Sequence, residues 1–300
     1  VLPGPAGSLG KPLATHLDID GLTFTGSTPV GKKLMQYSGQ SNLKRTFLEL
    51  GGKSPNIVFA DADLDKAATM AAVAVFYNGG QTCTAGTRLI VQHEIMDEFL
   101  DRVTEKARGW MPGDPLDPAT TMGPMIDAEQ CRTVADYVKV GSEEGAQIVF
   151  GGRQVMEETG GHYFQPSIFA GVDNAMWIAQ EEIFGPVLSV IGFRTAEEAV
   201  RTGCLEAGTP DFFNPDNVRF LSDEQFAFTA AVNGIMLREK TATNFYLGKF
   251  YAESLILAET GNIAGSIQIA GTDEASQLPF FVTACDYTLI GEELYAASAY

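Results

Sequence analysis

Short apolar runs that suit β-strands alternate with stretches of helical spacing over the first two thirds of the chain, and no other feature constrains the fold as strongly. The expected strands cover residues 1–3, 21–25, 55–59, 88–92, 147–150, 164–170 and 184–193. The expected helices cover residues 13–16, 29–37, 64–77, 94–109 and 129–145. Strands that are separated by helices pair in parallel, so this alternation predicts an α/β fold.

The pattern changes after about Arg201. Ser222 and Gln225 have the spacing of a helix capping box, and apolar residues follow at helical spacing. We expect a second helix over residues 242–260, before three glycines interrupt the pattern. The sequence therefore predicts a mainly helical C-terminal segment.

The charge balance excludes several classes of partner. The chain has 20 Lys and Arg against 38 Asp and Glu, a formal net charge of −18. Such a surface repels nucleic-acid phosphates and anionic lipids, so we expect neither as a partner. No run reaches the roughly 18 uncharged apolar residues of a membrane helix, and no basic leader precedes an apolar stretch. We expect a cytoplasmic protein.

The cysteines do not indicate a metal site. The chain has four, far apart, with no CxxC pair and no histidine close to any of them in sequence; they are Cys83, Cys131, Cys204 and Cys285. Zinc sites usually show clustered Cys and His ligands. We therefore expect no bound metal.

One glycine-rich segment almost matches a phosphate-binding P-loop. Gly26 to Lys32 follow the pattern G-x-x-x-x-G-K, but Lys33 stands where a Mg²⁺-holding Ser or Thr is required. An ordinary loop is the stronger alternative to a triphosphatase. Gly26 still allows close approach of a ligand, Ser27 can donate to an anion, and a helix that begins near Pro29 offers unpaired N–H groups. A pyrophosphate would suit this segment.

Cys83 lies between glycines in a loop that joins a helix to a strand, in the segment GGQTCTAG. A lone cysteine is more often a small core residue than a nucleophile. Flanking glycines, however, allow backbone N–H groups to point at an oxyanion, which a nucleophile requires. Spacing alone leaves both interpretations open.

Two acidic positions are further candidates. Glu49 is enclosed by apolar residues and followed by two glycines, so we expect it to be buried; burial raises the proton affinity of a carboxylate and favours general-base catalysis. The alternative is a carboxylate held by nearby backbone donors. Glu182 precedes a strand and can accept hydrogen bonds from ribose hydroxyls, although paired acids at such a position are usually solvated.

Four segments in order resemble the aldehyde dehydrogenase superfamily: LTFTGSTPVGK, LELGGKSPNIVFADADLD, GQTCTAGTRLIV and EEIFGPVLSV. Glu49 and Cys83 lie 34 residues apart, which matches the family's spacing of base and nucleophile. The resemblance covers about residues 1–200. Residues 115–124 are similar to members that act on aminoaldehydes from polyamine breakdown.

The resemblance implies an oxidoreductase that converts an aldehyde to a carboxylic acid with NAD or NADP. Cys83 would be the nucleophile that forms a thiohemiacetal and then a thioester, and Glu49 would activate the hydrolytic water. The implied cofactor contacts are Gly26 and Ser27 to the pyrophosphate, Val30 to the adenine, Leu50 near the nicotinamide, Glu182 to its ribose and Phe184 beside it.

The resemblance also implies a domain organisation. Residues 1–48 would be the C-terminal part of a dinucleotide-binding domain and residues 49–201 the catalytic domain; residues 202–300 do not match the family. In the family, an oxyanion-hole asparagine would precede Val1, and an oligomerisation strand would follow residue 200 but is not found in this sequence. We therefore expect a fragment with little or no activity on its own, although the family is homo-oligomeric. The tail has a faint similarity to an uncharacterised bacterial family.

Three interpretations therefore remain for the whole chain. It is an NAD(P)-dependent enzyme or a piece of one, a non-catalytic scaffold that keeps the family fold, or a fusion of two unrelated reading frames near residue 202. Rapid labelling by thiol-reactive aldehyde analogues would separate the first from the second, because only an activated cysteine reacts quickly at neutral pH.

Overall fold

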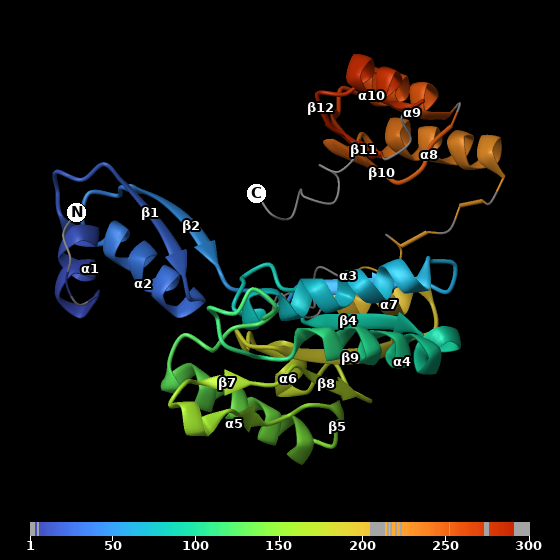
Figure 1. Ribbon diagram of the computed structural model, residues 1–300. Coiled ribbons are helices and arrows are strands. Elements are labelled where there is room, and N and C mark those ends of the chain that lie inside the picture. The colour runs from blue at the N-terminus through green and yellow to red at the C-terminus, as the bar shows by residue number, and fades with distance from the viewer. Residues whose placement is uncertain are drawn as a thin grey trace. The chain divides into compact units, whose positions relative to one another are not determined.

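The computed structural model divides the chain into two compact units, residues 1–215 and residues 216–300 (Figure 1). The structure describes residues 4, 6–204, 214, 216, 218, 219, 221, 222, 224–251, 253–272 and 276–290. The strand expected at residues 1–3 lies outside the described residues. Each unit is built around its own sheet.

The main sheet of the first unit has the strand order β3-β4-β9-β8-β5. The first four strands are mutually parallel, and β5 pairs antiparallel with β8 at one edge. The bounds are β3 Pro55–Val58, β4 Arg88–Gln92, β5 Gln147–Phe150, β8 Ser167–Ala170 and β9 Val187–Phe193. The predicted α/β fold is confirmed, and the expected strands at these positions agree with the observed ones within a few residues.

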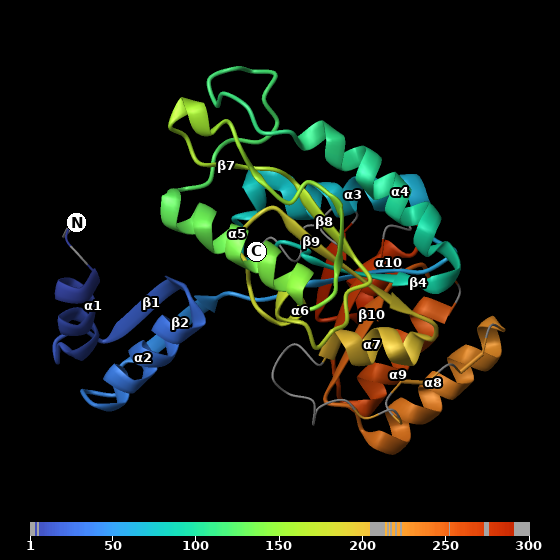
Figure 2. The same ribbon diagram turned by 90° about the horizontal axis from the view of Figure 1, so that it is seen from below.

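Helices cover both faces of this sheet (Figure 2). On one face, α3 and α4 pack against apolar side chains such as Leu89 and Val190. On the other, α5 and α6 pack against Phe169 and Ile191. The bounds are α3 Leu64–Phe76, α4 Met96–Ala107, α5 Ala128–Glu143, α6 Trp177–Gln180 and α7 Ala196–Cys204, and a small hairpin comprises β6 Gln154–Val155 and β7 Tyr163–Phe164. The three central strands, β4, β8 and β9, are buried along nearly their whole length, which explains their mainly apolar sequences.

The N-terminal part of the first unit contains two parallel strands, β1 Gly21–Gly26 and β2 Arg45–Leu50, and two helices, α1 Ala6–Thr15 and α2 Thr28–Gly39. The strand and the α2 helix expected here are confirmed. Gly4, Gly7 and Gly10 suggest a glycine-rich turn before a short helix at residues 13–16, but that prediction is wrong, because Gly7 and Gly10 lie inside α1. Tertiary contacts outweigh their low helix propensity: Ala14 is fully buried, and its carbonyl accepts a hydrogen bond from Lys44 Nζ at 2.7 Å.

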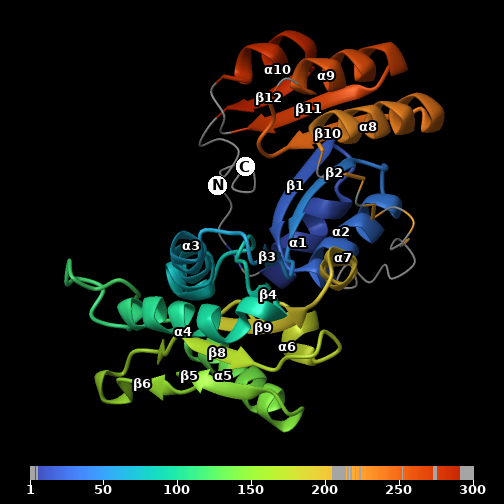
Figure 3. The same cartoon turned by 90° about the vertical axis from the view of Figure 1, so that its right-hand side faces the viewer.

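The second unit has three parallel strands in the order β10-β11-β12, with helices α8, α9 and α10 on one side (Figure 3). The bounds are α8 Gln225–Glu239, β10 Thr243–Leu247, α9 Glu253–Ala264, β11 Ile267–Thr272, α10 Leu278–Ala284 and β12 Tyr287–Ile290. Met236, Tyr246, Leu257 and Phe281 are in its buried core. Helices make up most of its regular structure, as the sequence predicts, but the three strands were not expected.

Two local expectations for this unit are wrong. A single helix over 242–260 does not form, because Thr243–Leu247 alternates between exposed and buried positions as a strand and Gly248, at φ +129°, follows it. Ser222 does not begin a capping box either. Its hydroxyl oxygen accepts the N–H of Glu224 at 3.0 Å, and α8 begins only at Gln225.

Candidate active site

A cavity of about 670 Å³ in the first unit brings together seven of the eight site residues that the sequence predicts. They come from the end of β1, the end of β2, the loop before β4 and the segment before β9: Gly26, Ser27, Glu49, Leu50, Cys83, Glu182 and Phe184. Val30 is not among the described residues that line it and is exposed on the first turn of α2. The segments that meet here are more than 150 residues apart in sequence, from Gly26 to Glu182.

Cys83 lies on a short loop between α3 and β4, and its thiol is free and exposed. The turn around it is closed by a hydrogen bond from Ala85 N–H to the carbonyl of Thr82 at 3.1 Å. Its neighbour Gly86 donates to Ala74 O in α3, also at 3.1 Å. The thiol is therefore presented to the cavity by a loop that is tied to the preceding helix.

Glu49 lies on β2, in register with Thr25 of β1, and both line the cavity. The expected burial of Glu49 is wrong: its side chain is exposed, as the alternation along β2 requires. Leu50 points to the other face of β2, where a Cβ atom on Gly31 of α2 would lie 2.6 Å from Leu50 Cδ2. Leu50 thus packs on α2, while the Glu49 carboxylate is on the opposite, open face of β2.

The N-terminus of α2 forms another part of the cavity wall. Ser27 is the N-cap residue, and among the described residues its hydroxyl makes no capping bond to the helix. Thr28 opens the helix, and Pro29 follows with the fixed φ that suits this position. A helix N-terminus with a free hydroxyl favours an anionic group.

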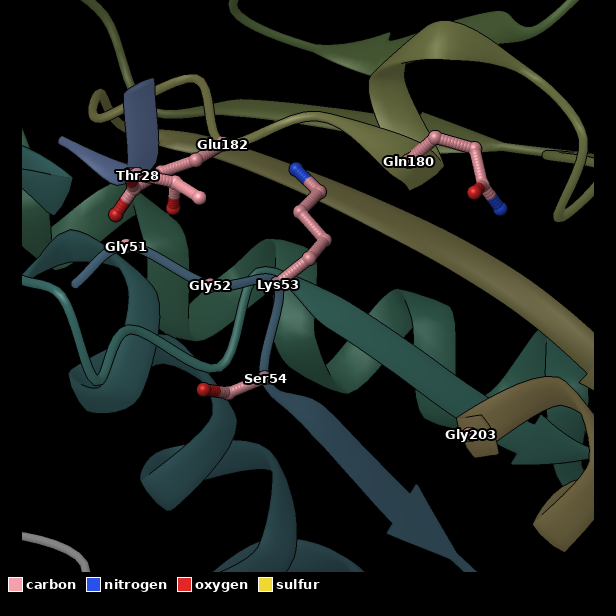
Figure 4. Close-up of a pocket in the computed structure, with 8 residues that line it drawn as sticks. All are labelled: Thr28, Gly51, Gly52, Lys53, Ser54, Gln180, Glu182 and Gly203. Atoms are coloured by element: carbon pink, nitrogen blue, oxygen red, sulfur yellow. The ribbon is translucent and has the colours of Figure 1, made fainter. Parts of the chain in front are cut away.

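Glu182 rests on the two glycines that follow β2 (Figure 4). Its carboxylate accepts a hydrogen bond from Gly52 N–H. Glu182 also lines a second cavity, of about 540 Å³, and the Lys53 side chain lines that cavity too. Burial raises the pKa of Glu182, while the Gly52 bond and the Lys53 ammonium act in the opposite direction. Only 2% of Lys53 is exposed, so its charge acts on Glu182 with little screening by water.

Several polar residues at the site were not singled out from the sequence, among them Lys53, Gln81 and Gln130. Lys53 and Gln81 lie inside the motifs around Glu49 and Cys83, so their position in the sequence could have indicated that they are at the site. Gln130 lies on α5, where no local pattern separates it from an ordinary solvated glutamine. Its Nε2 donates to the carbonyls of Ile183 and Phe184, both at 2.9 Å.

The described part of the chain contains neither a membrane-spanning helix nor a cluster of metal ligands. No helix there is long and apolar enough to cross a membrane. No group of three His, Cys, Asp or Glu side chains is gathered there in a way that could hold a metal ion.

Comparison with known families divides the sequence in two overlapping parts. The profile of the Aldehyde dehydrogenase family matches residues 1–203. The profile of a Domain of unknown function (DUF6754) matches residues 167–300, which include the whole second unit.

Similar proteins align with the first two thirds of the chain. Aldehyde dehydrogenase family 2 member C4 of Arabidopsis thaliana is 44% identical over 201 residues, which are 67% of this chain and 40% of that protein. The chain thus spans about two fifths of the length of the curated relatives it matches.

Solved structures give the same coverage. A mutant of the indole-3-acetaldehyde dehydrogenase AldA of P. syringae, in complex with NAD+ and IAA, is 55% identical, with a TM-score of 0.67 over 68% of this chain and 41% of that one. Gamma-glutamyl-gamma-aminobutyraldehyde dehydrogenase from Burkholderia cenocepacia is 53% identical, with a TM-score of 0.66 over 68% and 41%. On the match over residues 1–203, this chain belongs to the aldehyde dehydrogenase family.

Proposed function

We propose that the chain oxidises an aldehyde to its carboxylic acid with NAD(P)+, with Cys83 as nucleophile and Glu49 as general base. One observation carries the proposal: Cys83, Glu49 and Glu182, from three separate segments, line a single cavity. A thiol, a solvated carboxylate and a ribose acceptor are the groups that this chemistry requires. Family membership supports the same assignment.

Cys83 begins the reaction. Its thiolate attacks the aldehyde carbon, a C–S bond forms, and the oxygen takes a proton to give a thiohemiacetal. Loss of hydride and of the hydroxyl proton converts this adduct into a thioester. The exposed position of the thiol allows an aldehyde to reach it.

Glu49 completes the reaction. Its carboxylate accepts a proton from water, the resulting hydroxide equivalent attacks the thioester carbon, and the C–S bond breaks to release the acid and the Cys83 thiolate. The exposure of Glu49 on the open face of β2 means that water reaches it without a conformational change.

The residues present fit a nicotinamide dinucleotide. The free Ser27 hydroxyl and the α2 N-terminus suit a pyrophosphate, and Glu182 can accept from ribose hydroxyls. When bound, the nicotinamide supplies the hydride acceptor. NAD+ in the AldA complex supports this choice; we propose NAD or NADP, with the pyrophosphate contacts at Gly26 and Ser27 and Phe184 beside the nicotinamide ribose.

The same proposal extends to domain roles and substrate class. We assign residues 1–48 to cofactor binding and residues 49–201 to catalysis. Aminoaldehydes are the favoured substrates, since the similarity of residues 115–124 agrees with the name of the Burkholderia relative, a gamma-glutamyl-gamma-aminobutyraldehyde dehydrogenase. No function is proposed for the second unit.

The test uses the full chain and two readouts. The first is NADH formation from short aliphatic and amino aldehydes by wild type, Cys83→Ser and the matched thiol control Cys285→Ser in the second unit. The second is NAD+ binding by calorimetry. We expect NAD+ binding in all three proteins and a low rate of NADH formation in wild type and Cys285→Ser only, because a serine hydroxyl is not ionised near pH 7.

Two results would contradict the proposal. NADH formation that persists in Cys83→Ser would remove Cys83 as the nucleophile. Absence of both NAD+ binding and NADH formation in the wild type would favour a non-catalytic scaffold.

A further inference from the structure

The backbone that leads into Cys83 is held in a rare conformation. Asn78, Gly79 and Gly80 have φ values of +52°, +63° and +70°, three successive left-handed residues. Asn78 and Gln81 close this turn reciprocally, since Asn78 Nδ2 donates to Gln81 O at 3.1 Å and Gln81 N–H donates to Asn78 O at 3.2 Å. Such a conformation persists only where the surroundings fix it.

The Gln81 side chain connects this turn to a distant segment. Its Oε1 accepts the N–H of Ile126 at 2.9 Å, across 45 positions of sequence. Ile126 directly precedes Asp127, whose carboxylate caps α5 by accepting the Gln130 N–H at 2.8 Å. The nucleophile loop is thus attached to the first turn of α5.

The same turn of α5 holds the segment that carries Glu182. Gln130 Nε2 donates to the carbonyls of Ile183 and Phe184 at 2.9 Å each. Phe184 has a φ of +54°, an unfavourable value for an aromatic residue. The hydrogen bonds from the Gln130 amide to the carbonyls of Ile183 and Phe184 stabilise this left-handed conformation of Phe184.

Direct packing joins the three segments at two glycines. A Cβ atom on Gly80 would lie 2.2 Å from Gly185 O, so the two backbones are in contact. A Cβ atom on Gly185 would lie 2.3 Å from Val134 Cγ2 of α5. The loop of Cys83, the segment of Glu182 and helix α5 therefore leave no room for one another to shift independently.

We infer that residues 126–130, which lead into α5 and begin its first turn, are a positioning frame that sets the separation of Cys83 and Glu182, with Gln81 and Gln130 as the positioning residues. The functional consequence of this frame rests on the proposed function: it would place the Cys83 thiol relative to a bound nicotinamide ribose. Neither amide needs to touch the aldehyde for this role. The frame couples the Cys83 loop to the Glu182 segment, and this coupling can be measured without enzymatic turnover.

The experiment compares amide hydrogen exchange by mass spectrometry in wild type, Gln81→Leu and Gln130→Leu, on peptides that cover residues 77–86 and 182–187. Leucine keeps the approximate volume and removes the hydrogen bonds. Gln92→Leu is the matched control, because Gln92 Oε1 accepts the N–H of Ala60 at 2.9 Å at the other end of β4. Gln130→Lys tests rescue, since lysine retains a donor for the two carbonyls.

We expect each of the two leucine variants to accelerate exchange about threefold or more in both peptides, although each removes bonds to only one of them. In the same samples, Gln130→Leu should change the alkylation rate of Cys83 about threefold relative to Cys285, and Gln130→Lys should restore it. The Gln92→Leu control should leave both peptides and the alkylation ratio at wild-type values.

Acceleration confined to the peptide that each glutamine contacts directly would overturn the inference, as would equal effects in Gln92→Leu. The two proposals fail separately. Coupled exchange without NADH formation would keep the frame and remove the enzymatic assignment, whereas Cys83-dependent turnover without coupled exchange would remove the frame alone.

Discussion

A Cβ atom on Gly51 would lie 1.9 Å from Oε2 of Glu182, so the glycine and the carboxylate share one space. The absence of a side chain at Gly51 allows Glu182 to reach the N–H of Gly52. This contact joins the end of β2, which carries Glu49, to the segment that precedes β9. The two halves of the proposed site therefore depend on a glycine that performs no chemistry.

Gly51→Ala should displace the Glu182 carboxylate and slow hydride transfer about tenfold or more, since a hydrogen bond to a charged group contributes about 1.5 kcal/mol. Folding should change little, because the displaced atom ends a flexible side chain. Gly52→Ala is the matched control: a Cβ there meets no described atom within 4 Å, and the N–H remains. Single-turnover NADH formation and thermal melting are the measurements. Equal rates for the two variants would contradict the steric explanation.

Gly80→Ala should destabilise the first unit by about 3 kcal/mol or more, from the left-handed φ and from the overlap with the Gly185 backbone. Gly79→Ala separates the two causes. Its φ is also positive, but the nearest atom to its Cβ would be Gln81 Nε2 at 3.4 Å, so we expect about 1–2 kcal/mol. Urea unfolding followed by tryptophan fluorescence reports this unit alone, since Trp110 and Trp177 are the only tryptophans of the chain. A cost for Gly80→Ala no greater than that for Gly79→Ala would show that the backbone contact is unimportant.

Arg88→Met should also destabilise the first unit, by about 3–5 kcal/mol. The Arg88 guanidinium is fully buried and, among the described residues, donates hydrogen bonds to Lys53 O, Asn174 Oδ1, Thr202 O and Gly203 O at distances of 2.8–3.2 Å. Methionine cannot satisfy these acceptors. Arg102→Met, which removes the exposed pair with Glu98, should cost less than about 1 kcal/mol in the same urea experiment. Similar losses for both variants would mean that the buried network is energetically unimportant.

The sequence predicted the sheet strands of the first unit because each is a short apolar run between turn residues. It did not predict β2, since Arg45–Leu50 alternates between the two faces and was interpreted only as the surroundings of Glu49. Because the alternation along β2 was not recognised, the prediction that Glu49 is buried was also wrong. Side chains that are adjacent in sequence lie on opposite faces of a strand, so apolar neighbours do not enclose a residue between them.

Residues within the motifs could be placed at one cavity from the sequence, whereas residues that make contacts across the fold could not. Gln130 contacts Phe184 over 54 positions, and no local pattern encodes that contact. Val30, which the resemblance places at the adenine, is exposed on the first turn of α2 outside this cavity, and its contact with a cofactor stays a prediction. In the second unit, the alternation in Thr243–Leu247 was available and was mistaken for part of a helix.

The second unit should lose stability as the pH rises from about 9 to 11. Burial, together with the carboxylate of Asp286, raises the pKa of Cys285 from 9.0 to about 11. The unfolded chain therefore releases this proton at a lower pH than the folded chain, so the stabilisation is complete below pH 9 and is lost as the pH passes 11. Pulse proteolysis with detection of peptides from this unit should show a steeper loss in wild type than in Cys285→Ala. Parallel pH profiles would show that the thiol is not the responsible group.

Glu49→Gln should separate the two halves of the proposed reaction. The amide cannot accept a proton from water, so hydrolysis of the thioester should slow about a hundredfold or more while thioester formation continues. The expected trace is a burst of NADH of up to one equivalent per chain, followed by stalled turnover, with mass spectrometry detecting an acyl group on Cys83. Glu94→Gln, an exposed acid beside β4, controls for the loss of one charge and should retain the wild-type trace. Because Glu49 is exposed, the substitution should not change the thermal stability, so a lost burst could not be attributed to unfolding. Steady-state turnover at the wild-type rate in Glu49→Gln would remove Glu49 from the mechanism and leave water activation to another group in the cavity.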